Sequence, residues 1–421
     1  MSNGKSRSWN WVPLASVTEK IGSGATPAGG KDSYKELGVA LIRSLNVHDL
    51  DFRYENLARL DEVQAKQLSN VTVERGDVLL NITGASVARC AVVPNAVLPA
   101  RVNQHVSILR PIKQVLDSSF LAYFLVSGEA KSALLGIGSG AGSTRQALTK
   151  AQLEEFLVPA PPIDEQKRIV AALDQAFAVL DRARAKAEES LSDARLVFEA
   201  HLRELFSAGE GKAWSTAPLC DLADFRNGIN FTKASRGKEV RVLGVKDFQN
   251  HFHAPDTGLD RVTIDGNLDP GDCLQSGDIV FVRSNGNPEL IGRSLVIERM
   301  SERTAHSGFT IRARLRDSEM VPSFLGHFLK SSAVRRQMVD GGTGTNIKSL
   351  NQGTLSRILV PLPSRAEQMR IVENLEAVRE RTTHIEARYT EQLADIAELR
   401  QSLLQAAFSG QLSCIAPPGI R

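Results

Sequence analysis

The segment from residue 157 to residue 207 occurs twice in this chain of 421 residues, the second time at a constant offset of 202. Leu-Val-Pro-Ala-Pro at 157–161 returns as Leu-Val-Pro-Leu-Pro at 359–363, and the Glu-Gln pair at 165–166 returns at 367–368. A shared offset over so long a block indicates two copies of one unit. Two long copies predict a pseudo-dimer formed by one chain, because a solenoid stacks three or more short repeats. Such a protein suits a partner that presents two similar sites.

The composition is that of an ordinary folded protein, with 42% hydrophobic and 24% charged residues. No apolar run reaches the ~18 residues that cross a bilayer, and the polar N-terminus lacks the apolar core of a signal peptide, so we expect a cytoplasmic protein. The four cysteines are scattered, which favours neither a disulfide framework nor a zinc site. A net charge of +3 neither requires nor excludes a nucleic-acid partner.

Residues 9–158 and 214–360 are predicted to be strand-rich globular segments. Both contain short apolar runs separated by Gly, Pro, Asn and Asp, which is typical of strands joined by turns. Residues 119–125 match residues 323–329 and predict one short helix in each copy. Elsewhere the two segments differ greatly, so we expect a shared framework with different loops.

Two long stretches, 163–207 and 364–409, contain neither Gly nor Pro and are predicted to be helices. Apolar residues recur in both at alternating steps of three and four, which is the coiled-coil period, over about five heptads. In the first stretch they are Val170, Leu173, Phe177, Leu180, Ala187, Leu191, Ala194, Phe198 and Leu205. In the second they are Ile371, Leu375, Val378, Thr382, Ile385, Tyr389, Ile396, Leu399 and Leu403.

Each of these helices would be a rod of roughly 65 Å at ~1.5 Å per residue. One apolar stripe per helix requires a partner, and the helix of the other copy is the nearest candidate. Antiparallel packing would place the two globular segments at opposite ends. The predicted parts are therefore residues 1–158, 159–210, 211–360 and 361–421.

Catalytic motifs are missing from the sequence. The glycine run 136–142 fails the GxGxxG pattern, because Ser143 stands where the third glycine should be. There is no GxxxxGK[ST], no [DN]PP[YF] of amino-methyltransferases, no convincing nuclease motif and no HExxH. We therefore expect a chain that performs no chemistry and holds no metal.

The glycine-rich run is itself duplicated, at 138–146 and 341–348. Its polar members are Ser143, Thr144 and Arg145 in the first copy and Thr343, Thr345, Asn346 and Lys348 in the second. Glycines let backbone N–H groups approach an anion, so one hypothesis is a cradle for a nucleic-acid phosphate. The alternative is a flexible hinge that leads into the helix pair.

The divergent loops contain side chains that suit base edges and phosphates, since Arg reads guanine and Asn or Gln reads adenine in the major groove. The candidates in the first segment are Arg43, Asn46, Asn81, Thr83, Arg89, Arg101, Asn103, Gln104 and His105. Those in the second are Lys246, Arg283, Asn285, Asn287, Arg293 and His306. Any single one is more often a plain surface residue than a base contact, and only their collection in the loops of a duplicated framework supports the DNA hypothesis.

Taken together, these features resemble the specificity subunits of type I restriction–modification systems. The resemblance rests on the duplicated Pro-x-Pro, Glu-Gln and Ile-Val entry into a long helix, at 159–170 and 361–372, and on Phe-Ser-Gly at 408–410. It also rests on the alternation of two variable segments with two long helices across nearly the whole chain. One departure is Ser-Arg at 364–365, where the first copy has Pro-Ile.

The resemblance implies an α+β protein with two α/β target-recognition domains, separated by a pair of long antiparallel coiled-coil helices, and an internal two-fold pseudo-repeat. It implies recognition of double-stranded DNA as two different half-sites, which suits domains about one DNA turn, ~34 Å, apart. The implied partners are two methyltransferase (modification) subunits, with restriction subunits in the full complex. S-adenosylmethionine, ATP and magnesium would be bound by those partners, and no cofactor by this chain.

Three alternatives remain open at this stage. The first is a self-sufficient enzyme such as a fused methyltransferase, which the missing motifs disfavour. The second is a coiled-coil protein–protein scaffold with peptide-binding end domains, for which DNA binding would be weak and independent of salt. The third is a specificity subunit of a system that methylates but does not cut.

Overall fold

The computed structural model describes residues 9–27, 29–138, 147–207, 214–232, 234–249, 251–340 and 349–409. Its internal contacts divide the chain into two compact units, residues 1–187 with 391–421 and residues 188–390. Each unit therefore combines one globular segment with part of each long helix. The predicted part boundaries stay predictions.

The first unit contains two four-stranded sheets among its described residues. The antiparallel sheet has the order β2-β11-β8-β9, formed by Thr18–Ser23, Val106–Pro111, Val78–Asn81 and Cys90–Val92. The mixed sheet has the order β6-β3-β10-β7, formed by Ala58–Leu60, Val39–Ile42, Ala100–Val102 and Thr72–Val73. The short pairs are β1 with β12 and β4 with β5, at Trp11–Pro13, Leu157–Pro159, Val47–His48 and Asp51–Phe52.

The second unit repeats most of this topology in its described residues, without counterparts of β4, β5 and β7. Its antiparallel sheet has the order β14-β20-β17-β18, formed by Ala223–Asn227, Thr310–Leu315, Ile279–Val282 and Ser294–Val296. Its mixed sheet has the order β16-β15-β19, formed by Asp260–Thr263, Glu239–Leu243 and Thr304–His306. Strand β13 (Ser215–Pro218) pairs with β21 (Leu359–Leu362), as β1 pairs with β12. The shared strand order confirms the shared framework that the repeat predicted.

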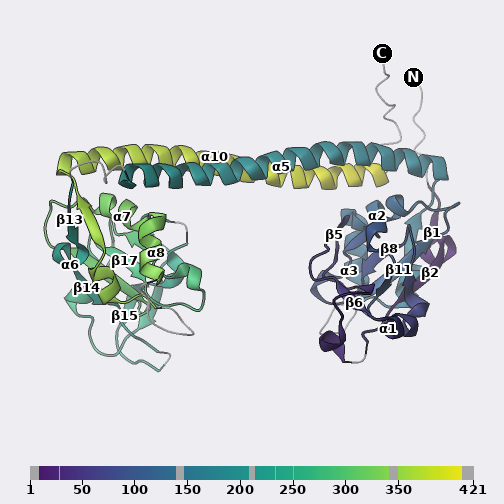
Figure 1. Ribbon diagram of the computed structural model, residues 1–421, viewed down its shortest axis with the longest axis horizontal. Helices are drawn as coiled ribbons and strands as arrows, with labels where there is room; N and C mark the ends of the chain where they lie inside the picture. Colours follow the sequence, from purple (N-terminus) through teal and green to yellow (C-terminus); the bar gives the residue numbers. More distant parts are fainter. Residues whose placement is uncertain are drawn as a thin grey trace, which may run out of the picture. The chain divides into compact units, whose positions relative to one another are not determined.

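Short helices occupy matching places in the two units. The predicted helix of each copy is present as α2 (Ser118–Val126) and α7 (Pro322–Lys330). In the first unit the apolar face of α2 joins one core with the antiparallel sheet and the long helices, and Figure 1 shows α2 between them. The other short helices are α1 (Glu62–Gln67), α3 (Gly128–Gly138), α4 (Lys150–Glu155), α6 (Leu219–Leu222), α8 (Ser332–Asp340) and α9 (Gln352–Ser356).

The two long helices are α5 (Ile163–Ser207) and α10 (Arg365–Phe408), as the sequence predicted. They pack together in each unit, through different residues. In the first unit Arg400 of α10 pairs with Asp181 of α5 at 2.7 Å and lies 4.2 Å above the ring of Phe177. In the second unit Arg195 of α5 lies 3.4 Å from Glu386 of α10.

The predicted apolar stripe of α10 is wrong at two positions. Ile385 and Leu399 were assigned to it, but their side chains are 39% and 49% exposed. Glu386 and Arg400, one residue further along, are the residues that contact α5. A strict heptad pattern missed this because the stems of long charged side chains also cover a helix seam.

No single helix among the described residues has the length and hydropathy of a membrane span, and the bent pair α2 and α3 passes only when the two are combined. Phe120, Leu121 and Leu125 of α2 are buried in the core of the first unit.

Candidate nucleic-acid interface

Three predicted residues of the first copy line one hollow. Thr83, Arg89 and His105 face a space of about 420 Å³ together with residues 44–45 and 84–86. The Thr83 hydroxyl is hydrogen-bonded to Nδ1 of His105. The hollow thus gathers a hydroxyl, a guanidinium and an imidazole, groups that can bond to a base edge or a phosphate.

Gln104 extends this cluster. Its Nε2 lies 3.1 Å from Nε2 of His105, and its Oε1 accepts a hydrogen bond from the hydroxyl of Thr26. On the other side, Nη1 of Arg89 lies 3.5 Å from Nδ1 of His48. The structure therefore brings together four of the residues predicted from the first copy.

The three predicted asparagines of this copy are buried and bond to backbone. Asn46 Oδ1 accepts from the N–H of Arg43 at 3.1 Å. Asn81 Nδ2 donates to the carbonyl oxygen of Ser44 at 2.9 Å. Asn103 is also buried. These side chains fix the loops around the hollow, and their burial does not favour the base contacts predicted for them.

Two predicted arginines are also engaged by the protein. Arg43 donates to the carbonyl oxygen of Asn56, and its guanidinium lies 5.3 Å from the ring centre of Tyr34. Arg101 donates to the carbonyl oxygen of Ala65 at 3.1 Å, and burial lowers its pKa. Neither lines the hollow that holds Thr83.

In the second copy, the loop between β17 and β18 carries four predicted residues, of which Arg283, Asn285 and Asn287 come first. The backbone N–H of Asn287 donates to Oδ1 of Asn285 at 2.8 Å. Asn287 in turn caps the short 3-10 turn Pro288–Leu290, because its Oδ1 accepts from the N–H of Glu289 at 3.0 Å. Arg283 stands at the start of the same loop.

The other predicted residues of the second copy are less available. Lys246 pairs with Asp260 at 2.6 Å, and Arg293 donates to the carbonyl oxygen of Gln249 at 2.9 Å. His306 is completely buried, with Nδ1 2.9 Å from the Thr310 hydroxyl. Burial lowers the pKa of His306 to about 3, so the imidazole is neutral and belongs to the interior.

A turn in each copy lies beside these loops. Turn A, residues 103–106, joins β10 to β11 in the first copy. The backbone N–H of Ile82, at the exit of β8, donates to the carbonyl oxygen of His105 in this turn at 3.0 Å. The N–H of Leu148, just after the glycine-rich run, donates to the carbonyl oxygen of Ile82 at 2.8 Å.

Turn B, residues 307–310, joins β19 to β20 and is bonded in the same way. The N–H of Arg283 donates to the carbonyl oxygen of Phe309 at 2.8 Å, and the N–H of Leu350 donates to that of Arg283 at 2.9 Å. In both copies the chain leaves the glycine-rich run next to the strand exit and the turn. The predicted polar residues of that run are Ser143, Thr144, Arg145, Thr343, Thr345, Asn346 and Lys348, and they lie outside the described residues.

Sequence reasoning missed Phe309. Its side chain is 62% exposed at the tip of turn B, where His105 stands in turn A. Hydrogen bonds to base edges come from polar side chains, so an aromatic residue in a loop gave no signal. Its place at the corresponding position of the repeat could have identified it.

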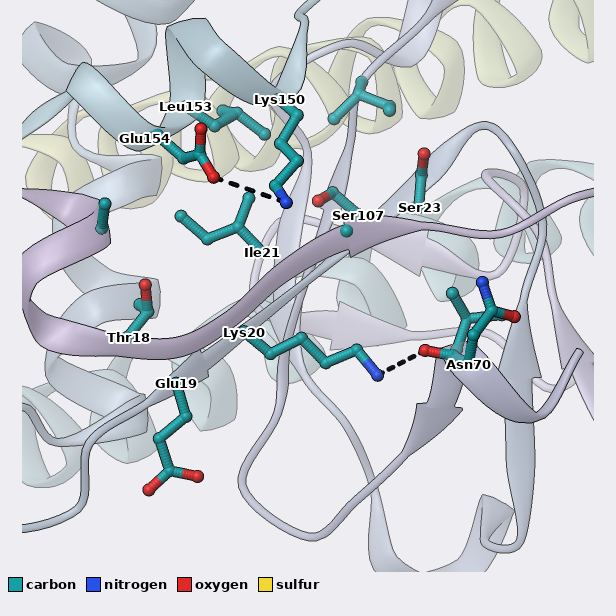
Figure 2. Close-up of a pocket in the computed structure, with 14 residues that line it drawn as sticks. Thr18, Glu19, Lys20, Ile21, Ser23, Asn70, Ser107, Lys150, Leu153 and Glu154 are labelled. Carbon is teal, nitrogen blue, oxygen red and sulfur yellow. Dashed lines mark hydrogen bonds and ion pairs between the residues drawn. The ribbon is translucent and has the colours of Figure 1, made fainter.

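Two lysines were missed as well. A hollow of about 560 Å³ lies beside β2 and α4 (Figure 2). There Lys20 donates to the carbonyl oxygen of Asn70 at 2.6 Å, and Lys150 pairs with Glu154 at 3.5 Å. Burial lowers the pKa of Lys20. The described lining of this hollow contains no histidine or cysteine.

No group of three His, Cys, Asp or Glu side chains within the described ranges is placed to hold a metal ion. What the described residues of both copies share is a turn, a strand exit and loops with hydrogen-bonding side chains.

Comparison with known proteins finds one protein family that matches the chain twice, once in each copy. Residues 9–189 and residues 211–395 each match the family model of the type I restriction modification DNA specificity domain. The specificity subunit of the type I restriction enzyme EcoKI from Escherichia coli strain K12 is 24% identical, over 98% of this chain and 91% of the relative. That of StySPI from Salmonella potsdam is 23% identical over the same shares.

Solved structures share the fold. A chain from work on the complex assembly and conformational transition of the type I R-M system has a TM-score of 0.76 at 18% identity, over 96% of this chain and 98% of that one. The HsdS subunit from Thermoanaerobacter tengcongensis has a TM-score of 0.54 at 19% identity, over 96% and 97%.

Proposed function

Because the chain belongs to the family of type I restriction modification DNA specificity domains, of which it contains two copies, we propose that each copy reads one half of a bipartite, asymmetric DNA sequence. The chain is the specificity subunit of such a system and performs no catalysis itself. Side chains in the loops around turn A would contact one half-site, and those around turn B the other.

The observation that supports two different half-sites is the contrast between framework and loops. The strand order of the antiparallel sheet and the backbone bonds at the strand exits are the same in both copies. The side chains at these exits differ between the copies. One copy has Thr83 and His105, and the other has Ser284 and Phe309. Base edges are distinguished by such differences in donors, acceptors and apolar groups.

We extend the proposal to the long helices. In it, α5 and α10 form an antiparallel coiled coil that spaces the two recognition domains and binds two methyltransferase subunits, with restriction subunits in the full complex. Exposed apolar side chains on these helices support a docking role, namely Val179, Leu196, Val197 and Met369. S-adenosylmethionine, ATP and magnesium would be held by the partner subunits, in the cytoplasm, and the partner would flip the target adenine out of the duplex.

The test is a methylation map of DNA from cells that express the chain together with a type I methyltransferase subunit. We expect methylated adenines in one split motif, present only when this chain is present. A stable complex with an active partner but no new methylation would contradict the proposal.

A DNA-binding experiment separates this function from the scaffold alternative. Phosphate contacts release counterions, so affinity for a duplex that contains the motif should fall steeply as salt rises. Weak binding that does not depend on salt would favour a scaffold with peptide-binding end domains. Failure of the isolated chain to bind S-adenosylmethionine would exclude a fused methyltransferase.

A further inference from the structure

Turns A and B share a side-chain bond as well as backbone bonds. In turn A the buried Asn103 accepts, through Oδ1, from the N–H of His105 at 3.0 Å. In turn B the buried Ser307 accepts, through Oγ, from the N–H of Phe309 at 3.3 Å. Two different residue types thus perform one task, which is to hold the backbone two residues further on.

A glycine clamps each turn from the neighbouring chain segment. A Cβ on Gly24 would lie 1.7 Å from the carbonyl oxygen of Val102, and one on Gly228 would lie 2.3 Å from that of His306, and each carbonyl belongs to the residue just before its turn. Any other residue would push the segment away from the turn, because a Cβ never comes so close to backbone. The close approach is therefore built into both copies.

Strand register confirms the correspondence. Ser107 pairs with Leu80 in the first copy, and Ile311 pairs with Phe281 in the second. Each of these pairs lies two residues past the tip of its turn. The tips are His105 and Phe309.

The tips differ in chemistry, although their backbones are held alike. His105 is half-buried and hydrogen-bonds with Thr83 and Gln104. Phe309 projects into solvent, and one exposed apolar residue alone would need no explanation. Here it occupies a position that five shared features of the fold fix: the strand register, the glycine clamp, the side-chain bond and two backbone bonds.

We propose that His105 and Phe309 are specificity-determining residues, each reading the same relative position in its own half-site. His105 reads a base edge through Nε2, where the base takes the place of the exposed Gln104 side chain, and Phe309 reads a thymine methyl group by apolar contact. This inference rests on the proposed function and names two residues that would determine the DNA sequence that is recognised. It also explains how two half-sites can differ while the framework is repeated.

The experiment compares methylation motifs directed by the wild-type chain and by His105→Ala and Phe309→Ala, each co-expressed with the methyltransferase subunit. Duplexes with every single substitution in the wild-type motif then serve as binding probes. We expect each variant to lose about tenfold discrimination at one base pair of one half-site, a different half-site for each variant. Phe309→Leu, which keeps an apolar group, should retain most of the preference for thymine.

Leu359→Ala is the matched control, because Leu359 is 59% exposed but lies on β21, away from turn B in the sequence. It should leave the motif unchanged. Thermal unfolding of each variant reports whether the fold is intact.

Each outcome is decisive. An unchanged wild-type motif in both alanine variants overturns this inference and leaves the proposed function standing. Equal weakening at all sequences, or changes in both half-sites, also overturns it, because the residues would then act on phosphates or on the fold. Absence of any motif with the wild-type chain overturns the proposed function itself.

Discussion

Gln166 and Gln368 stand 202 residues apart in the chain and make the same three side-chain hydrogen bonds. Oε1 of Gln166 accepts from the N–H of Asp117 at 2.8 Å, and Oε1 of Gln368 accepts from the N–H of Val321 at 2.7 Å. Each Nε2 donates to two carbonyl oxygens, at 2.8 and 2.8 Å in the first copy and at 3.2 and 3.0 Å in the second. In both copies this buried amide therefore ties the start of a long helix to the loop before α2 or α7.

Removal of that amide should destabilise its own unit. Gln166→Ala leaves the N–H of Asp117 and the carbonyl oxygens of Val115 and Pro161 without their partner, and we expect a loss of about 3 kcal/mol. Urea unfolding measures it. Lys167→Ala, at the exposed neighbouring position, is the control and should stay within about 0.5 kcal/mol of wild type. Equal stability of both variants would contradict the role given to Gln166.

Substitution of the buried Asp278 should lower the free energy of unfolding by more than substitution of Gln166. Asp278 pairs with Arg314 at 2.7 Å, and the aspartate side chain is only 1% exposed. Asp278→Asn should cost about 3 kcal/mol or more, because the guanidinium would keep its charge without its partner. Replacing both residues by apolar ones of similar volume should restore much of the loss. A double variant no better than the single one would show that the charge is not the cause.

The globular segments are tied to the long helices by corresponding residues of different chemistry. Tyr123 of α2 donates its hydroxyl to Asp174 of α5, and His327 of α7 bonds to Glu376 of α10 at 2.9 Å. His327 is completely buried and Asp174 is exposed, so Glu376→Ala should cost more unfolding free energy than Asp174→Ala. We expect about 2 kcal/mol against about 0.5 kcal/mol by urea unfolding. The reverse order would argue against the bond to Glu376 as a structural tie.

Acid should weaken the second unit through His306. Burial lowers its pKa from 6.5 to about 3, so the unfolded chain binds a proton that the folded unit excludes. The free energy of unfolding that the neutral, buried imidazole contributes is complete above about pH 6.5. It is lost as the pH falls, at ~1.4 kcal/mol per pH unit. His306→Gln should flatten the pH dependence of unfolding between pH 6.5 and pH 5 by about that slope. An unchanged slope would mean that another group causes the acid sensitivity.

Exchange of one globular segment should change one half-site. When residues 214–360 are replaced by the corresponding segment of another family member, the methylation map should keep one half of the motif and change the other. Exchange of residues 9–158 should do the opposite. If either exchange altered both halves, the two copies would not read DNA independently.

The sequence by itself determined the two-copy organisation, both long helices and the helix at 119–125 with its counterpart. These features depend on periodicity and on residues whose effect is local, such as the glycine- and proline-free stretches. Periodicity was not enough at Ile385 and Leu399. Both were predicted to lie in the contact between the long helices, but their side chains are exposed.

Only the tertiary structure decided which loop side chains are available to a ligand. Asn46, Asn81 and His306 resemble Thr83 in the sequence as polar loop residues, but they are completely buried, whereas Thr83 lines a hollow. Phe309 looks like a core residue in the sequence and is exposed in the fold. The physical reason is that a loop side chain is buried or presented by segments far away in the chain, and no local pattern records where those segments pass.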